Sequence, residues 1–201
     1  MRGLLILCLS LLAGAAPLAV LAGAQVYEPL SRDVQTALSR EISDRGVPDL
    51  KFDNPEDGYK WLLEMSDRLA KRVPDTQFRI DLLKTIHYEA KRAGLDPQLV
   101  LGIVHVESGF KKYAVSKAGA RGLMQVMPFW VDLIGRQDDN LFHIRTNIRY
   151  GCVILRHYIT LEKGDLYRAL GRYNGSLGRP EYPNQVLAAW HGTYKYRGRS
   201  T

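Results

Sequence analysis

The chain has 201 residues, 46% of them hydrophobic, and a formal net charge of +7 at pH 7. That length allows one globular domain with a sizeable core and a small helical extension, and it excludes two large independent domains. The basic surface favours polyanionic partners by long-range attraction. No nucleic-acid-binding motif accompanies the charge, so no nucleic-acid partner is expected.

The first 24 residues have the layout of a secretory signal peptide. A basic Arg2 precedes an apolar run that ends in the small residues "AGA" at 22–24. We therefore expect residues 1–24 to be cleaved and the protein to be exported with no stable transmembrane span; an uncleaved anchor is the alternative. Cleavage leaves Cys152 as the one cysteine, which excludes an intramolecular disulfide and favours a small buried apolar residue at that position.

Residues 25–75 carry two predicted helices and form an N-terminal helical extension. The first helix follows a cap at Ser31 and ends near Gly46, with apolar residues at helical spacing. The second opens at Asn54-Pro55, where asparagine caps the helix and proline occupies its first turn. No strand-like alternation of useful length competes with the helical periodicity, so the protein is predicted to be mainly α.

Residues 76–190 form the main predicted domain. A helix starts at Asp75 and closes at Gly94. The next, "PQLVLGIVHVESG", opens at Asp96-Pro97 and is apolar on nearly all sides, so it is expected at the centre of the domain. A short helical piece is predicted at "RGLMQVMP", and three more helices at "TNIRYGCVILRHYITLE", "GDLYRALGRYN" and "YPNQVLAAW". Residues 191–201 are predicted to be a loose basic tail.

Glu107 occupies an unusual place, the last turn of the helix that is expected to be buried. Burial and the negative end of the helix dipole both disfavour the charged carboxylate and raise its pKa. A raised pKa suits a general acid that works near neutral pH. A glutamate that simply points outward from the last turn is the competing interpretation.

The segment that follows Glu107 favours a sugar site. Gly109, Gly119 and Gly122 permit backbone turns that other residues resist, and Met124 and Gln125 come directly after them. A glutamine and a serine can offer fixed hydrogen bonds, and a methionine can cover an apolar ring face. Together these side chains suit an amide-bearing sugar.

Three ordered motifs resemble the soluble lytic transglycosylase family. They are "ESGFKKYAVSKAGARGLMQVMP" from Glu107, "NIRYG" at 147–151 and "RYNGS" at 172–176. The resemblance covers roughly residues 76–190. The chain departs from the pattern at Lys112, where the family often has proline, and at Gly175-Ser176, where it often has alanine and glycine.

The resemblance implies a lysozyme-like helical domain in the periplasm, in solution or associated with the membrane. It also implies that this domain cleaves the β-1,4 bond between N-acetylmuramic acid and N-acetylglucosamine in peptidoglycan glycan strands. Glu107 matches the family's single acid and base, and the substrate-binding positions are matched by Ser116, Met124, Gln125, Tyr173 and Asn174. Structural alternatives stay open: Met124 in the core, Ser116 in a turn, and Tyr173 as a packed aromatic residue.

The implied reaction explains why Glu107 has no carboxylate partner. Retaining and inverting glycosidases need a second carboxylate. In the lytic reaction Glu107 protonates the leaving oxygen and then removes a proton from the sugar's own C6 hydroxyl, which attacks C1 and closes a 1,6-anhydro ring. Five further acidic residues lie outside the motifs and are interpreted as solvated charges or helix caps: Asp132, Asp138, Asp139, Glu162 and Asp165.

No cofactor or metal is expected, because the five histidines show no paired spacing suited to zinc on one helix face. Two other functions stay open: a goose-type lysozyme-like hydrolase that admits water, and a non-catalytic cell-wall-binding or assembly protein. A cell-wall or secretion machinery protein is a candidate partner. The sequence leaves open whether the enzyme acts on chain ends or interiors, and whether the extension packs on the main domain or docks a partner.

Overall fold

The computed structural model describes residues 24–43, 46, 48–50, 52–196 and 198. Nearly all of the expected signal peptide lies outside these residues. Within the described part the chain is helical and contains no strand, only two isolated bridges, so the mainly α prediction is confirmed. The described helices include none that is both long and apolar enough to span a bilayer.

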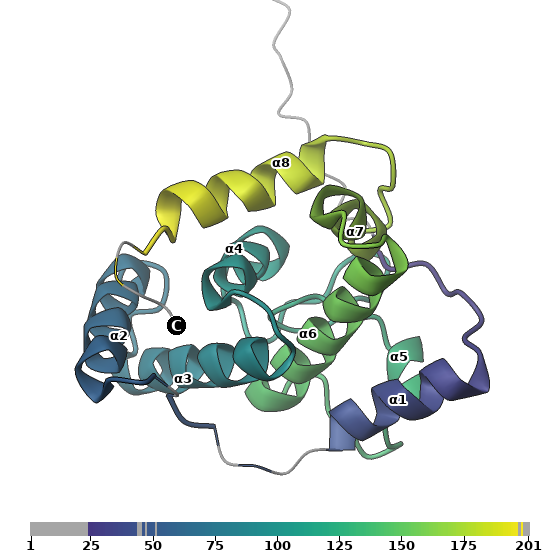
Figure 1. The fold of residues 1–201 in the computed structure, drawn as a ribbon, viewed down its shortest axis with the longest axis horizontal. Helices are drawn as coiled ribbons and strands as arrows, with labels where there is room; N and C mark the ends of the chain where they lie inside the picture. Colours follow the sequence, from purple (N-terminus) through teal and green to yellow (C-terminus); the bar gives the residue numbers. More distant parts are fainter. Residues whose placement is uncertain (1–23, 44–45, 47, 51, 197, 199–201) are drawn as a thin grey trace, which may run out of the picture.

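Eight α-helices and one π-helical turn make up the described fold (Figure 1). In chain order they are α1 (Arg32–Ser43), α2 (Pro55–Leu69), α3 (Thr76–Arg92), α4 (Pro97–Ser108), α5 (Phe129–Ile134), α6 (Ile144–Leu161), α7 (Leu166–Tyr173), α8 (Glu181–Ala188) and η1 (Ala189–Thr193). The predicted caps are present: the side chains of Asn54, Asp75 and Asp96 each accept a hydrogen bond from a backbone N–H in the first turn of the helix that follows.

Helix α4 lies at the centre of the molecule, as its uniformly apolar sequence predicts. In Figure 1, α3 and α8 lie on opposite sides of α4, and both helices contact it. Gly102 allows the approach of α8 and η1, because a Cβ on this residue would lie 3.2 Å from Val186 O and 3.3 Å from Trp190 N. The central position of α4 fixes Glu107, in its last turn, relative to the surrounding helices.

The N-terminal extension packs on the main domain. Helix α1 contacts α5 and α6, and α2 contacts α3. A buried ionic group, which we call the Glu89 cluster, joins these parts: Glu89 is fully buried and pairs with Arg92, Arg145 and Arg149. Arg149 also donates from Nη1 to the carbonyl oxygen of Ile42 at 2.9 Å, which holds the end of α1.

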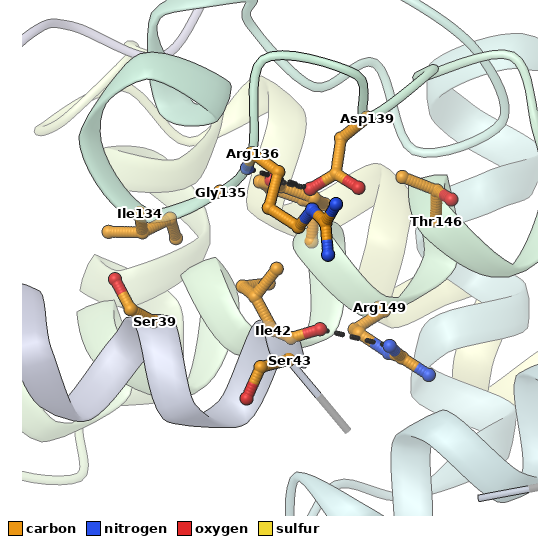
Figure 2. A pocket seen from close by; sticks show the side chains of 10 residues that line it. Ser39, Ile42, Ser43, Ile134, Gly135, Arg136, Asp139, Thr146 and Arg149 are labelled. Atoms are coloured by element: carbon orange, nitrogen blue, oxygen red, sulfur yellow. Dashed lines mark hydrogen bonds between the residues drawn. The ribbon is translucent and has the colours of Figure 1, made fainter. Parts of the chain in front are cut away.

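A cavity of about 220 Å³ remains between α1, α5 and α6 (Figure 2). Ser39 and Ile42 come from α1, Arg136 and Asp139 line the opposite side, and Arg149 lies beside Ile42. None of the six predicted site residues lines this cavity. The cavity therefore lies apart from the predicted site residues.

Two local predictions are wrong. The segment "RGLMQVMP" is not a helix but a chain of turns with bridges from Arg121 to Val115 and to Val126, and α5 begins after Pro128. Gln125 has a positive φ of 50°, which a right-handed helix excludes. The predicted loose tail is packed as far as residue 196: Tyr194 is fully buried, and Arg68 donates to the carbonyl oxygens of residues 193 and 195.

Candidate active site

Glu107 lies in the last turn of α4, which ends at Gly109 in the left-handed conformation. The carboxylate is held by two side chains from the C-terminal part of the chain. The Tyr182 hydroxyl donates to Glu107 Oε1 at 2.7 Å, and Asn174 forms a second hydrogen bond. Three segments therefore meet at one partly exposed carboxylate.

Burial raises the pKa of Glu107 to about 8, although the hydrogen bonds from Tyr182 and Asn174 act in the opposite direction. The predicted rise is confirmed, with removal from water as its largest cause. Near neutral pH the protonated form of this carboxyl is therefore well populated. Burial also raises the pKa of Tyr182 well above its usual range, so its hydroxyl remains a neutral donor.

The loop after α4 is folded on its own hydrogen bonds. Ser116 Oγ accepts from Ala120 N at 3.0 Å, and the backbone groups of the same two residues pair as well, so the serine closes a turn. Gln125 is 3% exposed and donates from Nε2 to Gly122 O at 2.9 Å and to Ala114 O at 3.2 Å. Both polar side chains thus fix the loop's shape.

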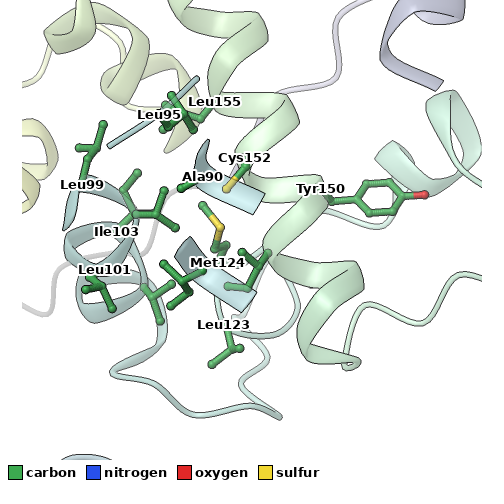
Figure 3. Packing of buried hydrophobic residues seen from close by; sticks show 14 of the residues in the cluster. Ala90, Leu95, Leu99, Leu101, Ile103, Leu123, Met124, Tyr150, Cys152 and Leu155 are labelled. Atoms are coloured by element: carbon green, nitrogen blue, oxygen red, sulfur yellow. The ribbon is translucent and has the colours of Figure 1, made fainter. Parts of the chain in front are cut away.

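Met124 lies in the core rather than at the surface. Its side chain is fully buried, and a Cβ on Gly151 of α6 would overlap its sulfur atom. Figure 3 shows the Met124 thioether among buried residues, close to Cys152 of α6, whose expected burial is confirmed. Met127, three residues later, is the methionine of this loop that keeps exposed surface.

Tyr173 lies behind this loop. It is fully buried and its hydroxyl donates to Met124 O at 2.8 Å. Burial raises the pKa of Tyr173, and the nearby Glu107 charge adds to the rise. Tyr173 is thus close to the carboxylate and bonded to the loop, while the next residue, Asn174, contacts Glu107 itself.

Comparison with known proteins identifies the family. Residues 84–185 match the family model described as "Transglycosylase SLT domain". The chain belongs to this family. A mainly α structure is what membership of this family implies, and the described chain has it.

Relatives and solved structures are similar over part of their length. A membrane-bound lytic murein transglycosylase C from Glaesserella parasuis is 35% identical over 112 residues, which cover 48% of this chain and 31% of the relative. A transglycosylase from Enterobacteria phage PRD1 is 32% identical over 111 residues, or 52% of this chain and 41% of that protein. The chain thus matches less than half of either relative. The 70 kDa soluble lytic transglycosylase from Escherichia coli is similar over 70% of this chain and 26% of that chain, with 17% identity and a TM-score of 0.43.

The second motif of this SLT-domain chain, "NIRYG", supports the loop from α6. Asn147 accepts from Met124 N at 2.7 Å and donates to Arg121 O and Leu141 O, both at 2.8 Å. Arg149 belongs to the Glu89 cluster, and Gly151 makes room for Met124. The motif therefore acts structurally, because its side chains hold the loop rather than approach Glu107.

The five other acidic residues considered from the sequence have roles elsewhere. Asp139 accepts from the Tyr150 hydroxyl at 2.6 Å, and Glu162 pairs with Arg168 and Arg172. Asp132 is exposed in the first turn of α5, and Asp138 forms an ion pair with Arg136. Asp165 is the N-cap of α7. The interpretation as solvated charges and caps is confirmed for Asp132, Asp138 and Asp165, but it is wrong for Asp139 and Glu162, which form structural contacts.

Sequence reasoning missed Tyr182 and Met127. Tyr182 follows Glu107 by 75 positions and meets it because α8 packs on α4. No local pattern marks such a contact. The motif contains two methionines, and the structure buries the one nearer to Gly122, Met124.

Proposed function

We propose that the protein is a peptidoglycan lytic transglycosylase that cleaves the β-1,4 bond between N-acetylmuramic acid and N-acetylglucosamine without consuming water. The observation that carries the proposal is a single carboxylate, Glu107, with a pKa raised to about 8 and two hydrogen-bonding partners. Membership of the SLT-domain family supports the same reaction. Asp139 is engaged by Tyr150 and Glu162 by two arginines, which favours one residue in both roles.

Glu107 is proposed to act first as an acid and then as a base. In its protonated form it gives a proton to the leaving oxygen as the glycosidic bond breaks, and the neighbouring acetamide of the sugar stabilises the cationic centre. The resulting carboxylate then takes the proton of the C6 hydroxyl, whose oxygen bonds to C1 and forms the 1,6-anhydro ring. Tyr182 donates to Oε1 and so orients the carboxyl group.

The proposed substrate contacts differ in kind. Ser116 and Gln125 are proposed to meet the sugar through the loop that they shape, and Asn174 through its position beside Glu107. Tyr173 is proposed to act indirectly, because its buried hydroxyl donates to Met124 O and so holds the loop that follows α4. Met127 replaces Met124 as the methionine proposed to lie against a sugar ring, because Met124 has no exposed surface.

Mass analysis of digestion products tests the reaction. Purified peptidoglycan treated with the protein should release muropeptides that lack one water, as anhydro sugars do. Products with reducing ends alone would instead support the goose-type hydrolase. Glu107→Gln should abolish release; if this variant released fragments as fast as the parent, the non-catalytic alternative would gain support.

We also propose that the protein acts in the periplasm, because its substrate lies there and its N-terminus reads as an export signal. Peptidoglycan glycan strands are the proposed partner. The basic residues of the loop, Lys111, Lys112, Lys117 and Arg121, can attract the carboxylates of peptide stems. A cell-wall or secretion machinery protein remains a second proposed partner.

A further inference from the structure

Residues 24–28 lie against both loops that carry the site residues. Gln25 is only 4% exposed, although its neighbours Val26 and Tyr27 are 58% and 56% exposed. A buried glutamine beside exposed apolar residues reverses the usual distribution. A buried polar group is normally held by hydrogen bonds, so the contacts of Gln25 explain its position.

Gln25 uses both ends of its side-chain amide on the loop after Glu107. Its Nε2 donates to Gln125 O at 3.0 Å, and its Oε1 accepts from Met127 N at 2.9 Å. An amide side chain carries one donor group and one acceptor at fixed separation. It therefore pairs with the loop backbone as a short peptide strand would, and it holds residues 125–127 in one shape.

The same segment touches the loop that contains Asn174. A Cβ on Gly175 would overlap the carbonyl oxygen of Ala24. Gly175, where the family often has alanine, thus leaves space for the segment. The residue before it, Asn174, hydrogen-bonds Glu107, so residues 24–25 lie between two loops that both belong to the site.

Two further contacts anchor the segment. Glu28 pairs with Arg172 of α7 at 2.7 Å. The ring of Tyr27 meets Phe129 of α5 edge-on, with 5.6 Å between the ring centroids. The segment is therefore attached on each side of the site, to residues 125–129 and to residues 172–175.

We propose that residues 25–28, which remain after the expected cleavage, form a clip that sets the spacing of these two loops for the reaction, and that Gln25 is its positioning residue. The proposal rests on the proposed function, which supplies the reaction. The clip holds Met127 through the side-chain amide of Gln25 and reaches residues 172–175 through the ion pair between Glu28 and Arg172. Loss of Gln25 should loosen the loops and change the placement of sugar against Glu107, while the helices stay folded.

Gln25→Ala tests the clip, with Gln35→Ala as the matched control. Gln35 also belongs to the extension and donates to a carbonyl oxygen of the main domain, that of Leu133, at 2.5 Å. Leu133 lies on α5 and not in the loop that Gln25 contacts. Backbone hydrogen exchange of the full-length chain should become faster at Met127 in Gln25→Ala and remain at the parent level in Gln35→Ala. On soluble peptidoglycan fragments, kcat of Gln25→Ala should fall about tenfold.

Gly175→Ala provides a second test, with Gly178→Ala as its control. Both glycines have a positive φ, 71° and 85°, so both substitutions strain the backbone, but only Gly175 faces another residue. In the uncleaved chain, which keeps Ala24, Gly175→Ala should displace the segment and speed backbone hydrogen exchange at Met127. Adding Gln25→Ala to Gly175→Ala should then have little further effect, because the contact is already lost.

Gln25→Glu separates positioning from general stability. A protonated glutamate reproduces the donor and the acceptor of glutamine, whereas the ionised form turns a second acceptor toward Gln125 O. The activity of this variant relative to the parent should therefore fall as pH rises. A ratio that does not vary with pH would contradict the role of the donor.

The outcomes distinguish the clip from the reaction. If the parent releases no anhydro fragments, the proposed function fails, and hydrogen exchange still decides whether Gln25 holds the loop. If the parent is active and Gln25→Ala matches it in kcat and in exchange at Met127, the clip is refuted. Equal losses in Gln25→Ala and Gln35→Ala would refute it too, since they would reflect docking of the extension alone.

Discussion

Replacing Tyr182 with phenylalanine removes the hydroxyl that donates to Glu107 Oε1 at 2.7 Å. This hydrogen bond stabilises the ionised carboxylate, so its loss should raise the pKa of Glu107 above its value of about 8. A hydrogen bond to a charged group contributes about 1.5–3 kcal/mol. With the lower figure, chosen because the carboxylate is partly exposed, the pKa should rise by about one pH unit.

The pH dependence of fragment release measures this shift. The first step needs the protonated acid, so activity declines as pH rises through the pKa of Glu107. In Tyr182→Phe the alkaline limb should move about one pH unit higher, while the maximal rate falls because the carboxyl is less well oriented. Tyr167→Phe is the control, because the Tyr167 hydroxyl donates at 3.0 Å to Asn184, which lies on α8 as Tyr182 does. An alkaline limb that stays in place or moves downward would refute the reasoning.

Two further predictions concern stability. The pKa of Glu107 is about 8 in the folded protein and near 4.5 unfolded, so its contribution to stability is fully present below pH 4.5 and is lost as pH rises to about 8. Between pH 5 and pH 9 the free energy of unfolding of Glu107→Gln should therefore rise relative to that of the parent by about 2 kcal/mol, after allowance for solvent screening. Denaturant unfolding at each pH measures this difference. A difference that is constant with pH would contradict the assignment. Gly151→Ala should lower the free energy of unfolding by about 1–3 kcal/mol, because the added methyl group overlaps Met124. Thermal unfolding measures this loss, and Gly192→Ala is the control because nothing lies within 4 Å of a Cβ at that position.

Local sequence signals predicted the helices well. Asn54, Asp75 and Asp96 start helices as expected, because capping depends on residues only two or three positions apart. The central position of α4 followed from its apolar sequence, and the raised pKa of Glu107 followed from that burial.

The parts that sequence reasoning missed depend on contacts between distant segments. The segment "RGLMQVMP" contains good helix formers, yet bonds to Asn147 of α6 and the left-handed conformation at Gln125 hold it in turns. Tyr182 contacts Glu107 because two helices pack together, and Gln25 contacts a loop 100 residues away in the sequence. Met124 and Met127 have the same local chemistry, and the fold alone decides which one is buried.

The Glu89 cluster has a consequence for the order of folding. Arg149 meets Glu89 across 60 residues and the carbonyl oxygen of Ile42 across 107 residues. Closing such long loops costs conformational entropy that a helical turn does not, so contacts of this kind form late. The N-terminal extension is synthesised first, but its partners in α6 and in the loop at residues 125–127 emerge about 100 residues later. Helix content should therefore be regained before activity when the unfolded protein is allowed to refold.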